Sequence, residues 1–180
     1  MAGTLSPVNQ AATSVIVLLI VFHDFLRQGC FVSTVCLTGN AIGAMNVRLA
    51  KKSFRLILAT EIAINTVILL ILSVFRRQIA LLYAPNDEDL YELLMTLLPL
   101  AGFIMLAFLG TILGVLNALH LVAEAAIIVV VTQWVITLPV GLYVVYYTPY
   151  GVKGLFLTQA IGMTLQIICC LVLTETADWD

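Results

Sequence analysis

Residues 54–75 read FRLILATEIAINTVILLILSVF, an apolar run whose charged residues are Arg55, near its start, and Glu61. An α-helix crosses the hydrocarbon core of a bilayer, ~30 Å thick, in about 20 residues. We therefore interpret this run as a transmembrane helix. Glu61 comes nine residues after Lys52, and a rise of about 1.5 Å per residue places it near the middle of the membrane.

The rest of the sequence repeats this character. Four more stretches are long and apolar enough to span a bilayer: 11–39, 90–116, 125–147 and 152–174. The chain is 62% hydrophobic and 10% charged, against about 45–50% and about 25% in soluble domains. We predict an all-α, polytopic membrane protein in which residues 1–180 form one domain with five transmembrane helices.

The charged residues gather between the apolar runs. Four of the eight Lys and Arg residues lie in the linker NVRLAKKSFR, residues 46–55. Basic linkers favour the cytoplasmic side, so this linker is predicted to be cytoplasmic and the linkers then alternate. No Lys or Arg precedes Arg27, so the first run lacks the basic region of a signal peptide and is interpreted as a helix. A net charge of -2 offers no basic surface for nucleic acid.

Small residues and prolines interrupt the runs in ways that suggest close packing. Gly39 and Gly43 form one G-x-x-x-G step, and Gly110 and Gly114 form a second. Such steps let two membrane helices approach closely. Pro99 and Pro139 lie inside predicted spans. A proline bends a membrane helix, and such a bend either lines a cavity or only curves the helix. In the acidic stretch APNDEDLYELL, Asn86 or Asp87 is expected to cap a helix rather than bind calcium.

The sequence lacks motifs for catalysis. It contains no G-x-S-x-G, no H-E-x-x-H, no glycine-rich phosphate loop and no paired C-x-x-C, so we expect no enzyme, no cofactor and no metal site. The four cysteines lie within apolar stretches and are expected to be buried thiols: Cys30, Cys36, Cys169 and Cys170.

Four ionisable residues are predicted at membrane depth: His23, Asp24, Arg27 and Glu61. Arg27 comes three residues after Asp24 and four after His23, so on a helix these three side chains can cluster on one face. Burial disfavours a charged carboxylate, so Glu61 and the cluster are candidate proton- or substrate-binding groups. The alternative is a buried structural pair or a side chain that reaches the membrane surface.

Several motifs resemble a known family. GNAIGAMN (39–46), followed by Lys51 and Lys52, is similar to the G-N-x-[LF]-G-A-G signature and basic linker of the multidrug and toxic compound extrusion (MATE) transporters. Four further landmarks follow in the family's order: LLPLAGF (97–103), GVL (114–116), LPVGLY (138–143) and GVKGLF (151–156). The resemblance implies a packing role for the motif residues Gly39, Asn40, Gly43, Gly114, Pro139, Gly141, Gly151 and Gly154.

The resemblance implies a fold and a function. MATE transporters have twelve helices in two lobes and exchange organic cations or drugs for protons or sodium ions. This chain resembles helices eight to twelve, most of the second lobe, and would need a first lobe that it does not contain. A multi-pass protein of the plasma membrane or of an organelle or vacuolar membrane is expected.

The sequence departs from the family where function is carried. Leu106 stands at the position of an acidic residue in the tenth helix, Asn117 replaces the arginine of G-V-L-R-G, and Val129 replaces an asparagine. Gln133 and Trp134 replace a pair of tyrosines. The ionisable site has therefore moved from the tenth helix to the eighth, or coupling has been lost.

These observations leave two functional hypotheses. In the first, the chain is part of a proton-coupled organic cation antiporter, with Asp24 and Glu61 as charged groups of the cavity. Gln133 adds a polar group, and Trp134 and Tyr143 would offer cation–π faces. In the second, it is a non-transporting, truncated or decayed fragment with only a packing role. A channel of five-helix subunits has no filter-like sequence to support it.

Overall fold

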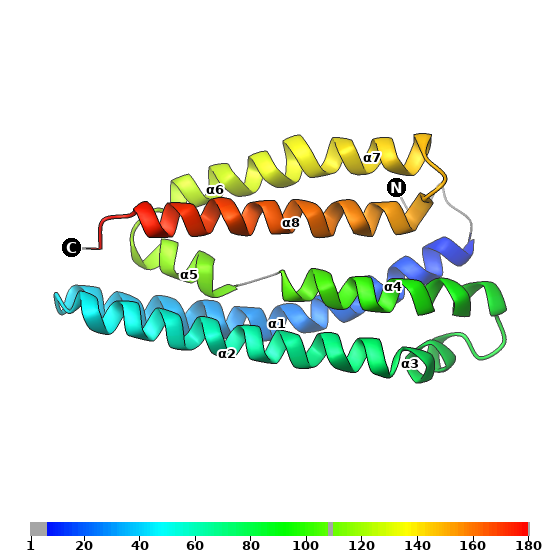
Figure 1. Ribbon diagram of the computed structural model, residues 1–180, viewed down its shortest axis with the longest axis horizontal. Helices are drawn as coiled ribbons and strands as arrows, with labels where there is room; N and C mark the ends of the chain where they lie inside the picture. The colour runs from blue at the N-terminus through cyan, green and yellow to red at the C-terminus, as the bar shows by residue number, and fades with distance from the viewer. Residues whose placement is uncertain (1–6, 108–109, 180) are drawn as a thin grey trace.

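Long helices run side by side along the length of the molecule (Figure 1). The computed structural model describes residues 7–107 and 110–179. In chain order the helices are α1 (Pro7–Gly43), α2 (Val47–Val74), α3 (Arg76–Tyr83), α4 (Glu88–Leu106), α5 (Gly110–Ala118), α6 (Val122–Val130), the π-helix η2 (Val131–Thr137), α7 (Leu138–Tyr147) and α8 (Gly151–Thr176). The predicted all-α fold is confirmed.

The five predicted spans are confirmed as long apolar helical segments. The structure has five candidate membrane spans, namely Pro7–Gly43, Val47–Val74, Glu88–Ala118, Val122–Tyr147 and Gly151–Thr176. The third runs through α4 and α5, and its residues 108 and 109 lie outside the described residues. The fourth runs through α6, η2 and α7. The helices are thus longer than the apolar runs that revealed them.

Most of the basic linker, residues 46–55, is helical, because α2 begins at Val47. The side chain of Asn46 caps α2 by accepting the N–H of Leu49 at 3.0 Å. Arginine and lysine are good helix formers, so the helix continues through the basic residues before it reaches the apolar run. With 28 residues and a rise of ~1.5 Å per residue, α2 is longer than the hydrocarbon core is thick.

The linker after α2 is also largely helical. It contains the short helix α3, which packs against α2 and α4. Ala80 is fully buried in this contact region and belongs to the main hydrophobic core. An amphipathic turn that can bury one small apolar face therefore forms a helix even in a short connection.

Asp87 caps α4, as the acidic stretch predicted. Its carboxylate accepts the N–H of Leu90 at 2.9 Å. Replacing Asp87 by alanine is expected to lower the free energy of unfolding by about 1 kcal/mol, because that N–H loses its partner. Thermal unfolding of the detergent-purified protein measures the change. Asn86→Ala, one residue earlier and exposed, is the matched control, and an equal loss in the control would contradict the assignment of the cap.

The main core lies where α1, α4 and α8 meet. Ile16, Leu94, Leu97 and Leu98 are fully buried there. α1 also contacts α2 and α5, and α8 contacts α5, η2 and α7. α1, α4 and α8 are therefore the elements against which most of the other helices pack.

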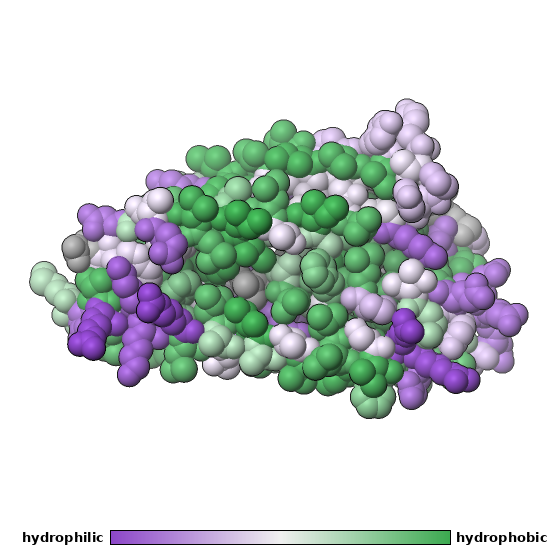
Figure 2. Space-filling model, in the orientation of Figure 1, coloured by the Kyte–Doolittle hydropathy of each residue, from purple (hydrophilic) through white to green (hydrophobic). Residues whose placement is uncertain are grey.

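The surface is suited to lipid rather than to water. In Figure 2 an apolar band covers the middle of the molecule, and hydrophilic residues gather at its two ends. Large apolar side chains on α1 and α2 point outward; Phe22, Phe25 and Leu56 are examples. An exposed apolar belt of this kind marks a surface that meets hydrocarbon.

The fourth span contains a π-helix that the sequence did not reveal. The hydroxyl of Thr137 donates to the carbonyl of Thr132, five residues earlier, at 2.7 Å. Pro139 follows directly in α7. Proline lacks an N–H and clashes with the carbonyl four residues before it, and a wider turn relieves that clash. The disturbance expected from Pro139 thus takes the form of η2.

Candidate functional site

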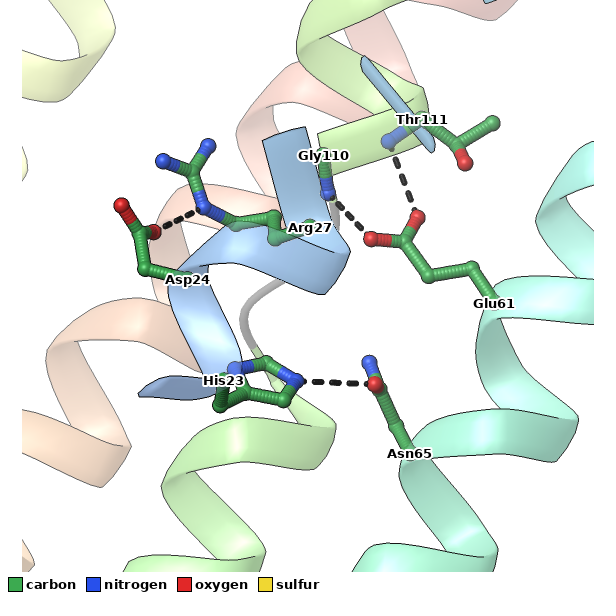
Figure 3. A network of polar contacts seen from close by, with 7 residues as sticks. All are labelled: His23, Asp24, Arg27, Glu61, Asn65, Gly110 and Thr111. Atoms are coloured by element: carbon green, nitrogen blue, oxygen red, sulfur yellow. Dashed lines mark hydrogen bonds and ion pairs between the residues drawn. The ribbon is translucent and has the colours of Figure 1, made fainter. Parts of the chain in front are cut away.

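The buried polar contact between α1 and α2 joins His23 to Asn65. Nε2 of His23 lies 2.9 Å from Oδ1 of Asn65, and both side chains are almost fully buried. Nδ1 of His23 and Nδ2 of Asn65 have no hydrogen-bond partner within the described residues. The contact therefore joins α1 to α2 in the interior of the bundle (Figure 3). One nitrogen of each side chain remains available for a further hydrogen bond.

Asp24 and Arg27 form a separate pair on α1. Nε of Arg27 donates to Oδ1 of Asp24 at 2.6 Å, and the Asp24 side chain is 38% exposed against 14% for Arg27. The pair and His23 point to different sides of α1 (Figure 3). The expected cluster of three side chains is thus divided, because adjacent residues on a helix point about 100° apart.

Glu61 holds the start of α5. Its two carboxylate oxygens accept the N–H groups of Gly110 and Thr111 at 2.7 and 2.9 Å, and the residue is 2% exposed. The first N–H groups of a helix lack partners within the helix and lie at the positive end of its dipole. Glu61 therefore caps α5 from α2, in a position where water is excluded.

Glycines bring α5 against α1 beside this cap. A Cβ on Gly110 would lie 2.5 Å from the carbonyl oxygen of Arg27, and one on Gly114 would lie 2.8 Å from that of Phe31. The G-x-x-x-G step of α5 is thus a close-approach surface. It positions the N–H groups that Glu61 binds.

The other motif residues pack to different degrees. A Cβ on Gly154 would lie 2.4 Å from Val144, and one on Gly141 would lie 3.3 Å from Leu155. Gly151 has a φ of +49°, which glycine adopts without strain at the turn between α7 and α8. The remaining motif residues lie at the end of α1, where neither glycine is tightly packed: Gly39, Asn40 and Gly43.

A cavity of about 420 Å³ lies among α1, α5, α6, η2 and α8. Its polar lining consists of Arg27, Gln133, Gln159 and Gln166. Nε2 of Gln159 donates to Oε1 of Gln133 at 3.1 Å, and Nε2 of Gln133 donates to Oε1 of Gln166 at 3.0 Å. We call these three side chains the amide ladder; it joins η2 to α8 along the cavity wall.

The aromatic candidates lie outside this cavity. Trp134 is 67% exposed and lines a smaller hollow of about 290 Å³, next to Gln133 and Gln159. Tyr143 is 62% exposed and stacks on Tyr147, with ring centroids 5.2 Å apart. Within the described residues, the larger cavity is therefore not lined by the aromatic side chains that the sequence pointed to.

Of three positions at which the sequence departs from the resembling family, one lines the cavity. Leu106 is the last residue of α4, and Asn117 lies in α5. Val129 lines the cavity. Cys170 also lines it and is the buried cysteine, whereas Cys36 is exposed. The expectation that all four thiols are buried is wrong, because part of α1 faces outward.

Sequence reasoning missed Asn65, Gln159 and Gln166. Each had a signal. Asn65 comes four residues after Glu61, which places both on one face of α2. Gln166 comes seven residues after Gln159, two turns along α8.

Among residues 7–107 and 110–179, no group of three or more His, Cys, Asp or Glu residues could hold a metal ion.

Comparison with known proteins identifies a family and several relatives. Residues 1–143 match the MatE family. The chain is 26% identical to Multidrug and toxin extrusion protein 1 of Oryctolagus cuniculus over 99% of its length and 32% of that protein. It is 29% identical to Protein DETOXIFICATION 41 of Arabidopsis thaliana over 78% of its length and 28% of that protein.

Multidrug and toxin extrusion protein 2 of Homo sapiens is 25% identical over 98% of the chain and 30% of the relative. The chain thus spans about a third of the length of the curated relatives it matches. A match over residues 1–143 covers most of the chain, and the five apolar helices provide the expected spans. The chain therefore belongs to the MatE family of multidrug and toxic compound extrusion transporters, and is an integral, multi-pass membrane protein rather than an enzyme.

Proposed function

We propose that this chain forms part of one lobe of a secondary antiporter that exports drugs and organic cations in exchange for protons rather than sodium ions. Family membership supports the transport function, and the names of two of the relatives refer to multidrug and toxin extrusion. The observation that carries the proposal for coupling is the buried carboxylate of Glu61, which binds the N-terminus of α5.

The position of Glu61 links protonation to the cavity. The two N–H groups that it binds belong to Gly110 and Thr111, and the next two residues of α5, Ile112 and Leu113, line the cavity. A protonated carboxyl accepts fewer hydrogen bonds and carries no charge for the helix dipole. Proton binding at Glu61 would therefore loosen the wall against which cargo rests.

The first test is export by vesicles that contain the chain, with and without a polypeptide that supplies the first lobe of a relative. A fluorescent organic cation is expected to leave faster when a proton gradient is imposed and to be indifferent to a sodium gradient. Glu61→Gln is expected to reduce gradient-driven export to the level of protein-free vesicles. Its matched control is Glu175→Gln, at the exposed end of α8.

Asp24→Asn tests whether Asp24, the other candidate carboxylate, is also needed for coupling. Asp24 is tied to Arg27 and is partly exposed, so this variant is expected to keep the dependence on the gradient. Unchanged export in Glu61→Gln would contradict the coupling role. Absence of gradient-driven export in every combination would favour the alternative of a chain with only a packing role.

A further inference from the structure

The cavity beside the amide ladder has the size of a site for a small organic molecule. Its volume of about 420 Å³ is within the range of ligand pockets, roughly 300–1,000 Å³. Apolar side chains from α5, α6 and α8 form most of the wall, among them Ile112, Leu113 and Met163. Such a wall favours an organic solute with an apolar body.

The charges of the wall do not suit an organic cation. Among the described residues that line the cavity, the charged one is Arg27, and none is a carboxylate or an aromatic side chain. A cation that entered would lose hydration and find neither an opposite charge nor a π face. The expected carboxylates lie elsewhere: Asp24 and Glu61 do not line this cavity.

The cavity is not suited to an organic anion either. Nε of Arg27 already donates to Asp24 at 2.6 Å, and Arg27 has a further interaction as well. The positive charge is therefore balanced by a neighbouring carboxylate within the same helix. An ion pair of this kind gives an approaching anion little net attraction.

The amide ladder offers uncharged hydrogen-bonding groups instead. Its two internal bonds use one N–H of Gln159 and one N–H of Gln133. Each primary amide has two N–H donors and a carbonyl oxygen with two lone pairs. Each of the three glutamines thus keeps at least one N–H for another partner. Exchanging the N and O assignment of all three amides reverses the two bonds and leaves the same number of N–H groups.

We propose that this cavity binds an uncharged organic molecule, or the uncharged part of a larger cargo, through hydrogen bonds to the amide ladder and apolar contact with α5 and α8. The inference rests on the proposed export function only in taking the bound molecule to be cargo. Any positive charge on such a cargo is met outside this cavity.

The test is binding to the detergent-purified chain, without transport. Three probes share one scaffold, N-phenylbenzamide, and carry at one position a hydroxyl, a trimethylammonium or a sulfonate group. Binding is read as ligand-induced thermal stabilisation of the protein as the probe concentration rises. The hydroxyl probe is expected to reach half of its effect at a concentration about tenfold lower than either charged probe.

Variants of the ladder connect binding to the proposed groups. Gln159→Leu and Gln166→Leu are each expected to weaken the hydroxyl probe by about tenfold, the effect of one lost hydrogen bond. Gln28→Leu, on the exposed surface of α1, is the matched control and should leave binding unchanged. Gln159→Glu, which adds a carboxylate to the wall, is expected to favour the trimethylammonium probe.

Three results would overturn the inference: equal or tighter binding of the trimethylammonium probe by the unmodified chain, tighter binding of the sulfonate probe, or an equal loss in Gln28→Leu. None of them bears on gradient-driven export. Conversely, if the chain binds the hydroxyl probe but exports nothing, the inference about the cavity stands and the proposed export function is contradicted.

Discussion

Gly162→Ala is expected to destabilise the protein strongly, by about 1–3 kcal/mol or more, and to lower the yield of folded material. A Cβ at this position would lie 1.9 Å from the hydroxyl oxygen of Thr137 and 2.9 Å from its Cβ. The hydroxyl also holds η2 together through its bond to Thr132, so rotation of the side chain costs that bond. Overpacking of this kind forces helices apart.

Thermal unfolding in detergent measures the change. Gly29→Ala is the matched control, because nothing lies within 4 Å of a Cβ there and alanine favours a helix. Adding Thr137→Ala to Gly162→Ala removes the clashing oxygen and is expected to restore part of the loss in a double-mutant cycle. A Gly162→Ala protein as stable as the control would show that α8 and η2 do not touch here.

Local features of the sequence were enough to predict the five spans. Each apolar run is long enough to cross a bilayer on its own, and this property depends on no distant residue. The same reasoning missed helix ends, since the basic residues of α2 are helical although they are polar. It also missed η2, whose wider turn depends on Pro139 and on close packing against Gly162.

In the candidate site, burial could be predicted from the sequence but contacts between helices could not. Glu61 was predicted to be buried at mid-membrane, and it is buried. Its partners, Gly110 and Thr111, are 49 and 50 residues away in the sequence, and no spacing rule connects them. The amide ladder likewise joins Gln133 to residues of another helix. Partners that meet only after the helices have packed cannot be inferred from periodicity within one helix.

Glu61→Leu is expected to have the other large effect, a loss of roughly 2–6 kcal/mol in the free energy of unfolding. Leucine removes the acceptor of two buried N–H groups, and each unsatisfied group costs about 1–3 kcal/mol. In a bilayer no water replaces the lost partner. Glu92→Leu, on the exposed side of α4, is the matched control. Denaturant unfolding of the purified protein measures both.

Glu61→Gln divides the two roles of this carboxylate. Its amide oxygen still accepts one of the two N–H groups, whereas its NH₂ group cannot accept the other. We therefore expect about half the loss of Glu61→Leu, and a protein that folds. A folded Glu61→Gln protein without gradient-driven export would mean that the charge is needed for coupling beyond its part in holding α5. If Glu61→Leu unfolds no more easily than the control, the carboxylate does not cap α5, and the physical link between its protonation and the cavity wall is lost.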